Sequence, residues 1–295
     1  EILRGGGLVA LPTETVYGLA ARADSADAVA GIYRAKGRPS FNPLIVHVSD
    51  IQAAARLARL DERAKRLASV FWPGALTMVL RLQEDAPLAS AVTAGLGTVA
   101  LRCPAHPVMQ AVLHQSGVPL AAPSANRSGA VSPTSAEHVR QSLGNRIDAI
   151  VDGGACAAGI ESTIVALRGE GTWQILRPGP IPQAPIRDVL GAESALLAEA
   201  GKIEAPGQLA SHYAPGKPVR LNASTAKSDE FHIGFSGVAG DINLSVTGDL
   251  AEAAARLYFA LHMAASSAKA RIAVAPIPDA DIGAAINDRL GRAAA

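Results

Sequence analysis

Short apolar runs bounded by glycine or proline, with segments of helical spacing between them, narrow the folds open to this chain. Five runs have the length and β-branched character of strands: 8–11, 44–48, 76–82, 99–101 and 164–167. Between the first two, Val29, Ile32 and Tyr33 recur at helical spacing up to Lys36, where a glycine supplies a stop signal. This alternation predicts an α/β fold.

Other signals place further helices and one hairpin. Asp24 or Ser25 can cap the first helix. Further helices are predicted at 51–70, after His106, and from Thr134, where Glu137 completes a capping box. Segments 162–167 and 172–176 have the pattern of a hairpin, which adds an antiparallel strand to the sheet. We therefore expect a twisted, mixed β-sheet with helices.

The length of the chain and a region interrupted by glycine and proline predict two domains. The 295 residues exceed the ~100–150 of a common domain. Breakers recur through 191–217, and beyond them lie strand-like runs at 231–235 and 272–275 and a helical stripe at 250–264. We expect the domain limits 1–190, a linker at 191–217, and a smaller α/β (Rossmann-like) domain at 218–295.

Charge, cysteines and motifs exclude several classes of protein. The net charge of +1 supplies no general attraction to nucleic acid or anionic membranes. Cys103 and Cys156 match no metal or disulfide spacing, and the P-loop, H-E-x-x-H and G-x-S-x-G motifs are missing. No run reaches the ~18 apolar residues of a membrane span, and no signal-peptide pattern is present. We therefore expect a cytoplasmic protein with no membrane partner.

Polar residues directly follow the first predicted strand. Thr13 and Thr15 flank Glu14 at the edge where α/β sheets commonly bind ligands. The two hydroxyls are candidate ligand contacts. The alternative is that they cap a helix or satisfy a turn.

A cationic pair lies at the end of the first predicted helix. Lys36 and Arg38 suit a pyrophosphate-bearing ligand, and we expect both side chains to be exposed. The alternative is a solvated pair stabilised by the helix dipole. Ser40, Asn42 and His47 follow on the same loop and strand. His47 alternates with apolar neighbours, so it either packs structurally or faces a ligand.

Later strand ends carry further candidates. Arg102 can bind a carboxylate bidentately, and Thr98 lies four residues earlier on the same strand face. Ala122 leaves room for a flat base, while Ser124 and Asn126 offer donors and acceptors. Ser132, Ser162 and Arg177 also lie at predicted strand ends and are candidate ligand contacts. The alternative for each is a capping or turn role.

Five basic residues lie close together at 56–66. Their interleaving with Asp61 and Glu62 is typical of a solvated helix face. A groove for double-stranded RNA is the alternative interpretation of these charges.

Seven ordered motifs resemble the YrdC-like threonylcarbamoyl-adenylate synthase family: LPTETVYGLA, the K-G-R loop leading into NPLIVHV, FWPGALT, TVALRCPAHP, LAAPSANRSG, GIESTIV and LRPGP. They cover about residues 5–182. The later APGQLASHYAP and the unit after it are similar to the longer, two-domain form of that family. The resemblance implies that 1–190 is a YrdC-like catalytic domain.

The resemblance implies condensation of L-threonine, bicarbonate and ATP into threonylcarbamoyl-adenylate and pyrophosphate, with Mg²⁺ on the ATP and no dedicated protein metal site. Partner proteins would use the product to form tRNA threonylcarbamoyladenosine, with a weak tRNA contact by this chain. By motif match, the residues around threonine would be Thr13, His47, Arg102, Ala122 and Ser162. Those around ATP would be Lys36, Arg38, Ser40, Thr98, Ser124, Asn126, Ser132, Arg177 and Tyr213.

The implied chemistry assigns different roles to these residues. Lys36 and Arg38 would be catalytic, because they would stabilise developing phosphoryl charge. No protein nucleophile is required, so Glu14 has no necessary acid–base role. His212 and Tyr213 in the linker would fold over the site as a lid, with Tyr213 contacting the nucleotide, and the alternative is an anchoring turn.

Two other functions compete with this one. A double-stranded RNA-binding module acting in tRNA or rRNA maturation would use the basic residues of 56–66. A carbamoyl-transfer domain like that of hydrogenase-maturation proteins would need acyl-phosphatase-like and zinc-finger segments, which this sequence lacks.

Overall fold

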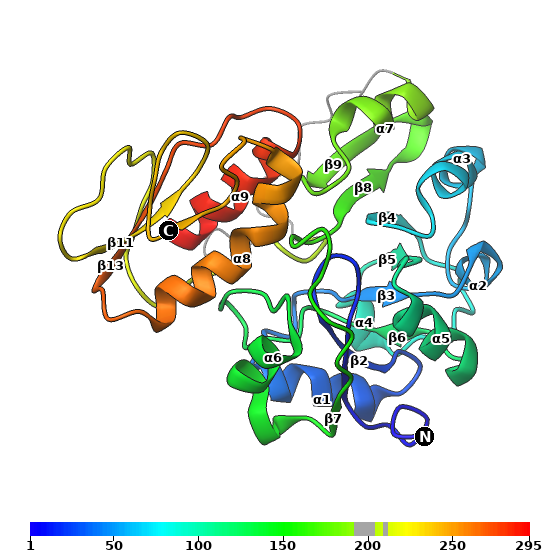
Figure 1. Cartoon of the computed structure of the whole chain (residues 1–295). Helices are drawn as coiled ribbons and strands as arrows, with labels where there is room; N and C mark the ends of the chain where they lie inside the picture. The colour runs from blue at the N-terminus through cyan, green and yellow to red at the C-terminus, as the bar shows by residue number, and fades with distance from the viewer. Residues whose placement is uncertain (192–203, 209–211) are drawn as a thin grey trace.

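The computed structural model describes residues 1–191, 204–208 and 212–295, which form two domains, each built on its own sheet (Figure 1). The large sheet has the order β7-β1-β2-β6-β3-β5-β4-β8-β9. Its strands are β1 (Val9–Leu11), β2 (Gly18–Arg22), β3 (Ile45–His47), β4 (Leu76–Arg81), β5 (Thr98–Arg102), β6 (Leu120–Ala121), β7 (Ala149–Ile150), β8 (Thr163–Leu167) and β9 (Trp173–Arg177).

The large sheet is mixed, as predicted. The pairs β1–β7, β3–β5 and β4–β8 are parallel, and the other neighbouring strands are antiparallel. The hairpin predicted within 162–176 is the antiparallel pair β8–β9. The α/β fold class with a mixed sheet is therefore confirmed.

The helices of the large domain begin and end at recognisable caps. They are α1 (Ala26–Lys36), α2 (Ile51–Ala55), α3 (Glu62–Phe71), α4 (Ser90–Thr93), α5 (Pro107–Ser116), α6 (Ala136–Leu143) and α7 (Gln183–Leu190), with 3-10 turns η1 (Gly144–Arg146) and η2 (Gly169–Gly171). Ser25 Oγ accepts the Ala28 N–H at the start of α1. Gly37 ends α1 at φ 62°, a conformation that glycine adopts without strain.

The single helix predicted at 51–70 is wrong, because the segment contains two helices. Between α2 and α3, Arg59 donates its backbone N–H to the carbonyl of Arg81 at 2.9 Å, at the end of β4. That pairing takes the backbone out of the helical hydrogen-bond pattern. Asp61 then caps α3 afresh by accepting the Ala64 N–H.

The predicted cap of the fourth helix is also displaced by one residue. Ser135, rather than Thr134, caps α6 and accepts the His138 N–H. Glu137 therefore does not occupy the third helical position that a capping box requires.

The C-terminal domain contains β10 (Val219–Arg220), β11 (Glu230–Gly234), β12 (Ile242–Asn243), β13 (Arg271–Val274), α8 (Leu250–Ser266) and α9 (Ile282–Ala294). Its strands pair in parallel in the order β10-β13-β11-β12, so the smaller α/β domain is confirmed. Both helices lie between this sheet and the large domain (Figure 1). Residues 192–203 and 209–211 of the predicted linker lie outside the described residues.

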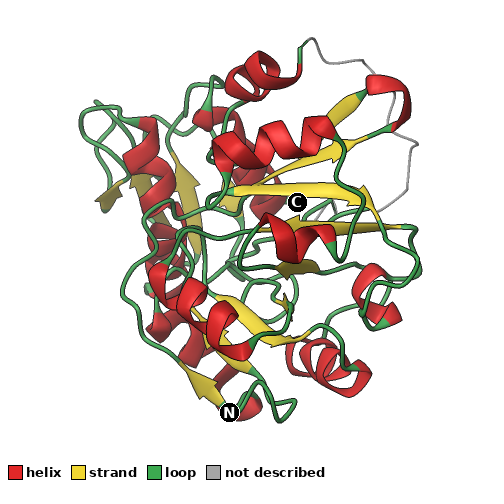
Figure 2. Ribbon diagram, turned by 90° about the vertical axis from the view of Figure 1, so that its right-hand side faces the viewer, coloured by secondary structure: helices red, strands yellow, loops and turns green. Residues whose placement is uncertain are grey.

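The two faces of the large sheet have different surroundings. Side chains alternate along a strand, so Val46 and Leu101 join the main core, to which α2 and α3 also contribute. Figure 2 is viewed from the side of these two helices. On the other face, Ile45 and Ala100 form a small cluster with Ala205, from the segment that follows the undescribed residues.

Candidate active site

A row of registered residues crosses the second face of the large sheet. His47 pairs with Arg102, Arg102 with Thr77, Thr77 with Ile164, and Ile164 with Arg177. Partners in register point to the same face of a sheet. The sequence predicted a site in loops at the sheet edge. The polar row extends this region onto the sheet face itself.

A pocket with a cavity volume of about 40 Å³ lies over this row. It is lined by all the residues predicted around threonine: Thr13, His47, Arg102, Ala122 and Ser162. Of those predicted around ATP, it is lined by Arg38, Ser124, Arg177 and Tyr213. The lining does not include Lys36, Ser40, Thr98, Asn126 or Ser132. Its remaining members are Thr15, Val16, Gly18, Ile45, Pro123, Glu161, Pro206, Gly207 and His212.

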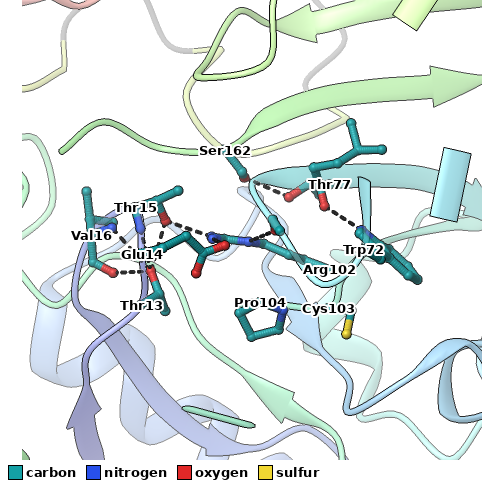
Figure 3. Close-up of polar contacts among 12 residues, drawn as sticks. Thr13, Glu14, Thr15, Val16, Trp72, Thr77, Arg102, Cys103, Pro104 and Ser162 are labelled. Atoms are coloured by element: carbon teal, nitrogen blue, oxygen red, sulfur yellow. Dashed lines mark hydrogen bonds and ion pairs between the residues drawn. The ribbon is translucent and has the colours of Figure 1, made fainter. Parts of the chain in front are cut away.

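The turn after β1 is built around the Thr13 hydroxyl. It donates to the Val16 carbonyl at 2.7 Å and accepts the backbone N–H groups of Thr15 and Val16. Thr13 Oγ1 and Thr15 Oγ1 are 2.9 Å apart (Figure 3). The turn role considered from the sequence is therefore present, and the same turn brings both threonines to the wall of the pocket.

Arg102 is held from three sides (Figure 3). Its Nη1 donates to Thr15 Oγ1 at 2.8 Å, its Nε donates to the Gly74 carbonyl at 3.1 Å, and its Nη2 lies 2.7 Å from Glu14 Oε1. Burial alone would raise the pKa of Glu14, but the charge of Arg102 lowers that pKa below its usual value. Glu14 offsets the positive charge of Arg102, so Arg102 would bind a ligand mainly through oriented hydrogen bonds rather than through net charge.

His47 presents a neutral imidazole. Burial and the nearby Arg102 lower the pKa of His47 to about 3. Its Nδ1 is buried and has no hydrogen-bond partner among the described residues. A buried polar atom left without a partner is costly, so this nitrogen marks a position for a ligand atom or a water.

Lys36 and Arg38 are 3% and 8% exposed, so the expectation that both are exposed is wrong. Lys36 Nζ donates to the carbonyls of Ser124 and Asn126, whereas Arg38 donates to the carbonyls at 42–43 and also lines the pocket. Burial holds the pKa of Lys36 well below its usual value and lowers that of Arg38 to about 10. Arg38 is therefore a cation at neutral pH, and Lys36 fixes the loop that carries Ser124.

Three other predicted residues lie away from the pocket lining. Ser40 is exposed on the loop after α1. Thr98 begins β5 and Arg102 ends it, so about 13 Å of strand separates them. Asn126 Nδ2 donates to two carbonyls of its own loop, an arrangement that supports the loop.

Arg177 and Ser162 form one hydrogen-bonded unit at the pocket wall. Arg177 Nε donates to the Ser162 carbonyl at 3.1 Å, and its Nη2 donates to Ser162 Oγ at 3.2 Å. Ser162 Oγ is also 2.7 Å from Thr77 Oγ1 (Figure 3). The remaining Arg177 donor, Nη1, reaches the Pro206 carbonyl at 3.3 Å. Arg177 thereby connects the sheet to the segment that covers it.

The segments 204–208 and 212–214 close the pocket. Pro206, Gly207, His212 and Tyr213 all line it, so both members of the predicted His-Tyr pair reach the site. A Cβ on Gly207 would lie 2.9 Å from Arg177 Cδ, and its φ of 87° also favours glycine. The close contact of this segment with Arg177 therefore depends on Gly207.

The structure adds Glu14, Thr77 and Glu161 to the residues that the sequence predicted. Glu161 Oε1 accepts from Ser132 Oγ at 2.5 Å, so Ser132 supports the pocket through this carboxylate. The signal for Glu161 was its place directly before Ser162 in the GIESTIV motif. Glu14 and Thr77 also lie in quoted motifs, LPTETVYGLA and FWPGALT, but those motifs did not show what the two side chains contact, because their partners are distant in sequence.

The basic residues of 56–66 are mostly paired with acids. Arg59 contacts Glu84, Arg63 contacts Asp61, and Lys65 contacts Glu62, at 2.7–2.8 Å. These contacts fit a solvated helix face. Within the described ranges, no helix is long and apolar enough to cross a membrane.

Two family models match this chain. The Sua5_yciO_yrdC model, described as telomere recombination, matches residues 1–179. The Sua5_C model, described as the C-terminal domain of threonylcarbamoyl-AMP synthase, matches residues 181–295. The chain belongs to the Sua5/YrdC family. The predicted resemblance to its two-domain form is confirmed.

Known Sua5/YrdC proteins resemble the chain in sequence and in structure. It is 49% identical over 224 residues to a threonylcarbamoyl-AMP synthase of Bacillus subtilis and 46% identical over 222 residues to that of Pyrococcus abyssi. These matches cover 75% and 74% of this chain but only 64% of either relative. The crystal structure of P. abyssi Sua5 complexed with L-threonine superposes with a TM-score of 0.89 at 34% identity, covering 99% of this chain and 92% of that one.

Proposed function

We propose that this chain is a threonylcarbamoyl-AMP synthase, which condenses L-threonine, bicarbonate and ATP into threonylcarbamoyl-AMP and pyrophosphate for tRNA threonylcarbamoyladenosine modification. The observation that carries the proposal is one pocket lined by every residue predicted around threonine and by four of those predicted around ATP. The B. subtilis and P. abyssi relatives, both named as synthases of this product, support the same activity.

Threonine would lie on the polar row of the sheet face. Its carboxylate would accept hydrogen bonds from the oriented guanidinium of Arg102, and His47 Nδ1 would gain the partner it lacks. The full set that we assign to threonine is Thr13, His47, Arg102, Ala122 and Ser162.

ATP would lie toward the covering segments. Arg38 and Arg177 bring two buried cations to the pocket wall, where triphosphate charge needs neutralising. The full set that we assign to ATP is Lys36, Arg38, Ser40, Thr98, Ser124, Asn126, Ser132, Arg177 and Tyr213. Members of this set that do not line the pocket would act by supporting its loops or after a rearrangement.

The reaction needs positioning and charge stabilisation rather than a protein nucleophile. The threonine amine forms a C–N bond with bicarbonate and water leaves, which gives a carbamate. A carbamate oxygen then attacks the α-phosphorus of ATP, and pyrophosphate leaves with the electron pair of the broken P–O bond. Arg38 would stabilise the charge that develops on the phosphoryl oxygens, while the buried pocket keeps water from the labile product.

We propose that Mg²⁺ enters the site on the ATP phosphates, as the family resemblance implies. Among the described residues, no group of three or more His, Cys, Asp or Glu side chains could hold a metal ion. The pocket carboxylate, Glu161, already accepts hydrogen bonds on both oxygens. Mg²⁺ bound to the ATP phosphates would offset their charge.

The covering segments would act as a lid. The cavity of about 40 Å³ is smaller than the ~300–1,000 Å³ of ordinary ligand pockets, so we infer that these segments move when ATP binds. We propose a catalytic domain at 1–190, a lid-bearing linker at 191–217 and a C-terminal domain at 218–295. The enzyme would act in the cytoplasm and deliver its product to proteins that modify tRNA.

Pyrophosphate release tests the proposal. Release should require threonine, bicarbonate and ATP together, and the adenylated product should appear by mass spectrometry. Arg38→Ala should lower kcat/KM by at least about 100-fold, because the substitution removes a buried cation beside the phosphates. Arg59→Ala is the matched control, since that side chain is exposed and paired with Glu84. Release without threonine would contradict the proposed activity, and an active Arg38 variant would contradict the role of that residue.

A further inference from the structure

A buried polar cluster joins the two domains at the wall of the pocket. Glu161, from the loop before β8, accepts a hydrogen bond from Ser132 on Oε1. On Oε2 it accepts one from the Tyr258 hydroxyl of α8 at 2.8 Å and one from Arg289 Nε of α9, also at 2.8 Å. Of the three groups that hold this carboxylate among the described residues, the C-terminal domain therefore supplies two.

Arg289 is the charged centre of the cluster. Its side chain is 0% exposed, and it also donates to the Pro178 carbonyl at 2.9 Å and to Asp288 Oδ2 at 2.6 Å. Burial alone would raise the pKa of Glu161, but the charges of Arg289 and Arg177 lower it to about 2. Glu161 is thus an anion at neutral pH, and Arg289 is its nearest compensating charge.

The position of Glu161 explains why its charge matters to the site. Glu161 lines the pocket together with Arg177, which we assign to the nucleotide. A carboxylate with no partner here would repel the phosphates of ATP and would attract Arg177 away from them. In the structure Arg177 donates instead to Ser162 and Pro206, while Arg289 and Tyr258 hold the carboxylate.

Arg289 also contacts the covering segment. Its guanidinium carbon lies 5.4 Å from the centre of the Tyr213 ring, within the range of a cation–π interaction. Tyr213 is 1% exposed, packs 5.6 Å from the Tyr258 ring, and adopts φ 64°, which is strained for a tyrosine. The surrounding rings and the cation hold Tyr213 in this conformation.

We propose that Arg289 of the C-terminal domain is a positioning residue of the nucleotide site. It neutralises Glu161 and holds Tyr213, so that Arg177 stays available for the phosphates. The inference rests on the proposed function. It means that the nucleotide site is complete only when the C-terminal domain is docked against the large domain.

Direct binding of a non-hydrolysable ATP analogue, measured by calorimetry on the full chain, tests the proposal. Arg289→Met should weaken analogue binding by at least about tenfold and leave threonine binding within about twofold of wild type. Because this variant buries an unpaired Glu161, the double variant Glu161→Gln/Arg289→Met is essential. Removing both charges should restore analogue affinity to within about threefold of wild type.

Two controls separate a local role from a general loss of structure. Arg289→Lys keeps the charge and should bind the analogue more tightly than Arg289→Met. Arg271→Met, at a side chain 58% exposed on the same domain, should leave binding unchanged. An equal loss of threonine and analogue binding in Arg289→Met, or a double variant no better than Arg289→Met, would overturn the proposal.

The outcome also separates this inference from the proposed function. If wild type binds the analogue and Arg289→Met binds it equally well, only the role of Arg289 is overturned. If wild type binds no nucleotide at all, the proposed function is overturned and the role of Arg289 with it.

Discussion

Gly159 lies where the loop before β8 touches the backbone of α8, and replacing it should loosen the contact between the domains. A Cβ at this position would lie 2.4 Å from Ala255 Cα, 2.5 Å from its carbonyl oxygen and 2.6 Å from the Ala254 oxygen. These are backbone atoms of a helix and cannot rotate away. An ordinary contact begins near 3.4 Å, so Gly159→Ala requires the loop and α8 to separate by about 1 Å.

Two terms set the magnitude. Gly159 has φ 70°, a conformation that costs a non-glycine residue about 1–2 kcal/mol, and overpacking typically costs about 1–3 kcal/mol more. The free energy of unfolding should therefore fall by about 2–5 kcal/mol. The same 1 Å displacement would stretch the hydrogen bonds from Tyr258 to Glu161 and from His262 to the Ser132 carbonyl, now 2.8 and 3.1 Å.

Gly154→Ala is the matched control, because Gly154 has φ 81° but open space around the Cβ position. Urea denaturation of both variants isolates the packing term from the backbone strain that they share. Gly154→Ala should lose only about 1–2 kcal/mol, and it should keep the affinity of wild type for an ATP analogue. If Gly159→Ala is as stable as Gly154→Ala, the reasoning from the α8 contact is refuted.

Three further predictions concern the site. Arg102→Lys keeps the positive charge but loses the planar guanidinium that donates to Thr15, so the KM for threonine should rise at least about tenfold and the KM for ATP should change less. Steady-state kinetics with each substrate varied in turn measures both values. Equal changes in the two KM values would contradict the assignment of Arg102 to threonine. The pKa of His47 is about 3 in the folded chain and 6.5 when the chain is unfolded, so between these values only the unfolded chain binds a proton at His47. The free energy of unfolding therefore keeps the full contribution of His47 above pH 6.5 and loses it as the pH falls toward 3. Wild type should therefore lose about 2 kcal/mol more than His47→Gln between pH 7 and pH 5 in urea denaturation, and equal losses would exclude this assignment. Tyr213→Ala should raise the KM for ATP more than the KM for threonine. A larger rise in the KM for threonine would contradict the assignment of Tyr213 to ATP.

Local chemistry made much of this fold predictable. The predicted hairpin, the start of α1 at Ser25 and its end at Gly37 follow from residues within a few positions of one another. The failures have a different cause. The break between α2 and α3 arises because Arg59 pairs with the end of β4, and no pattern inside 51–70 records that partner.

The site divides in the same way. The ordered motifs identified the residues predicted around threonine, all of which line the pocket. Motifs could not show that Lys36 and Arg38 are buried, since burial depends on chain packed from elsewhere. Neither could they show that Glu14 offsets the charge of Arg102.

The sequence by itself therefore determined the fold class, the family and the kinds of side chain that the site contains. Only the tertiary structure decided how these side chains are arranged. Strand register sets His47, Arg102 and Arg177 in one row, and register is a relation between strands far apart in the chain. The ion pair between Glu161 and Arg289 spans 128 positions, so neither residue carries a local sign of the other. Electrostatic partners of this kind are set by packing, and packing is a property of the whole chain.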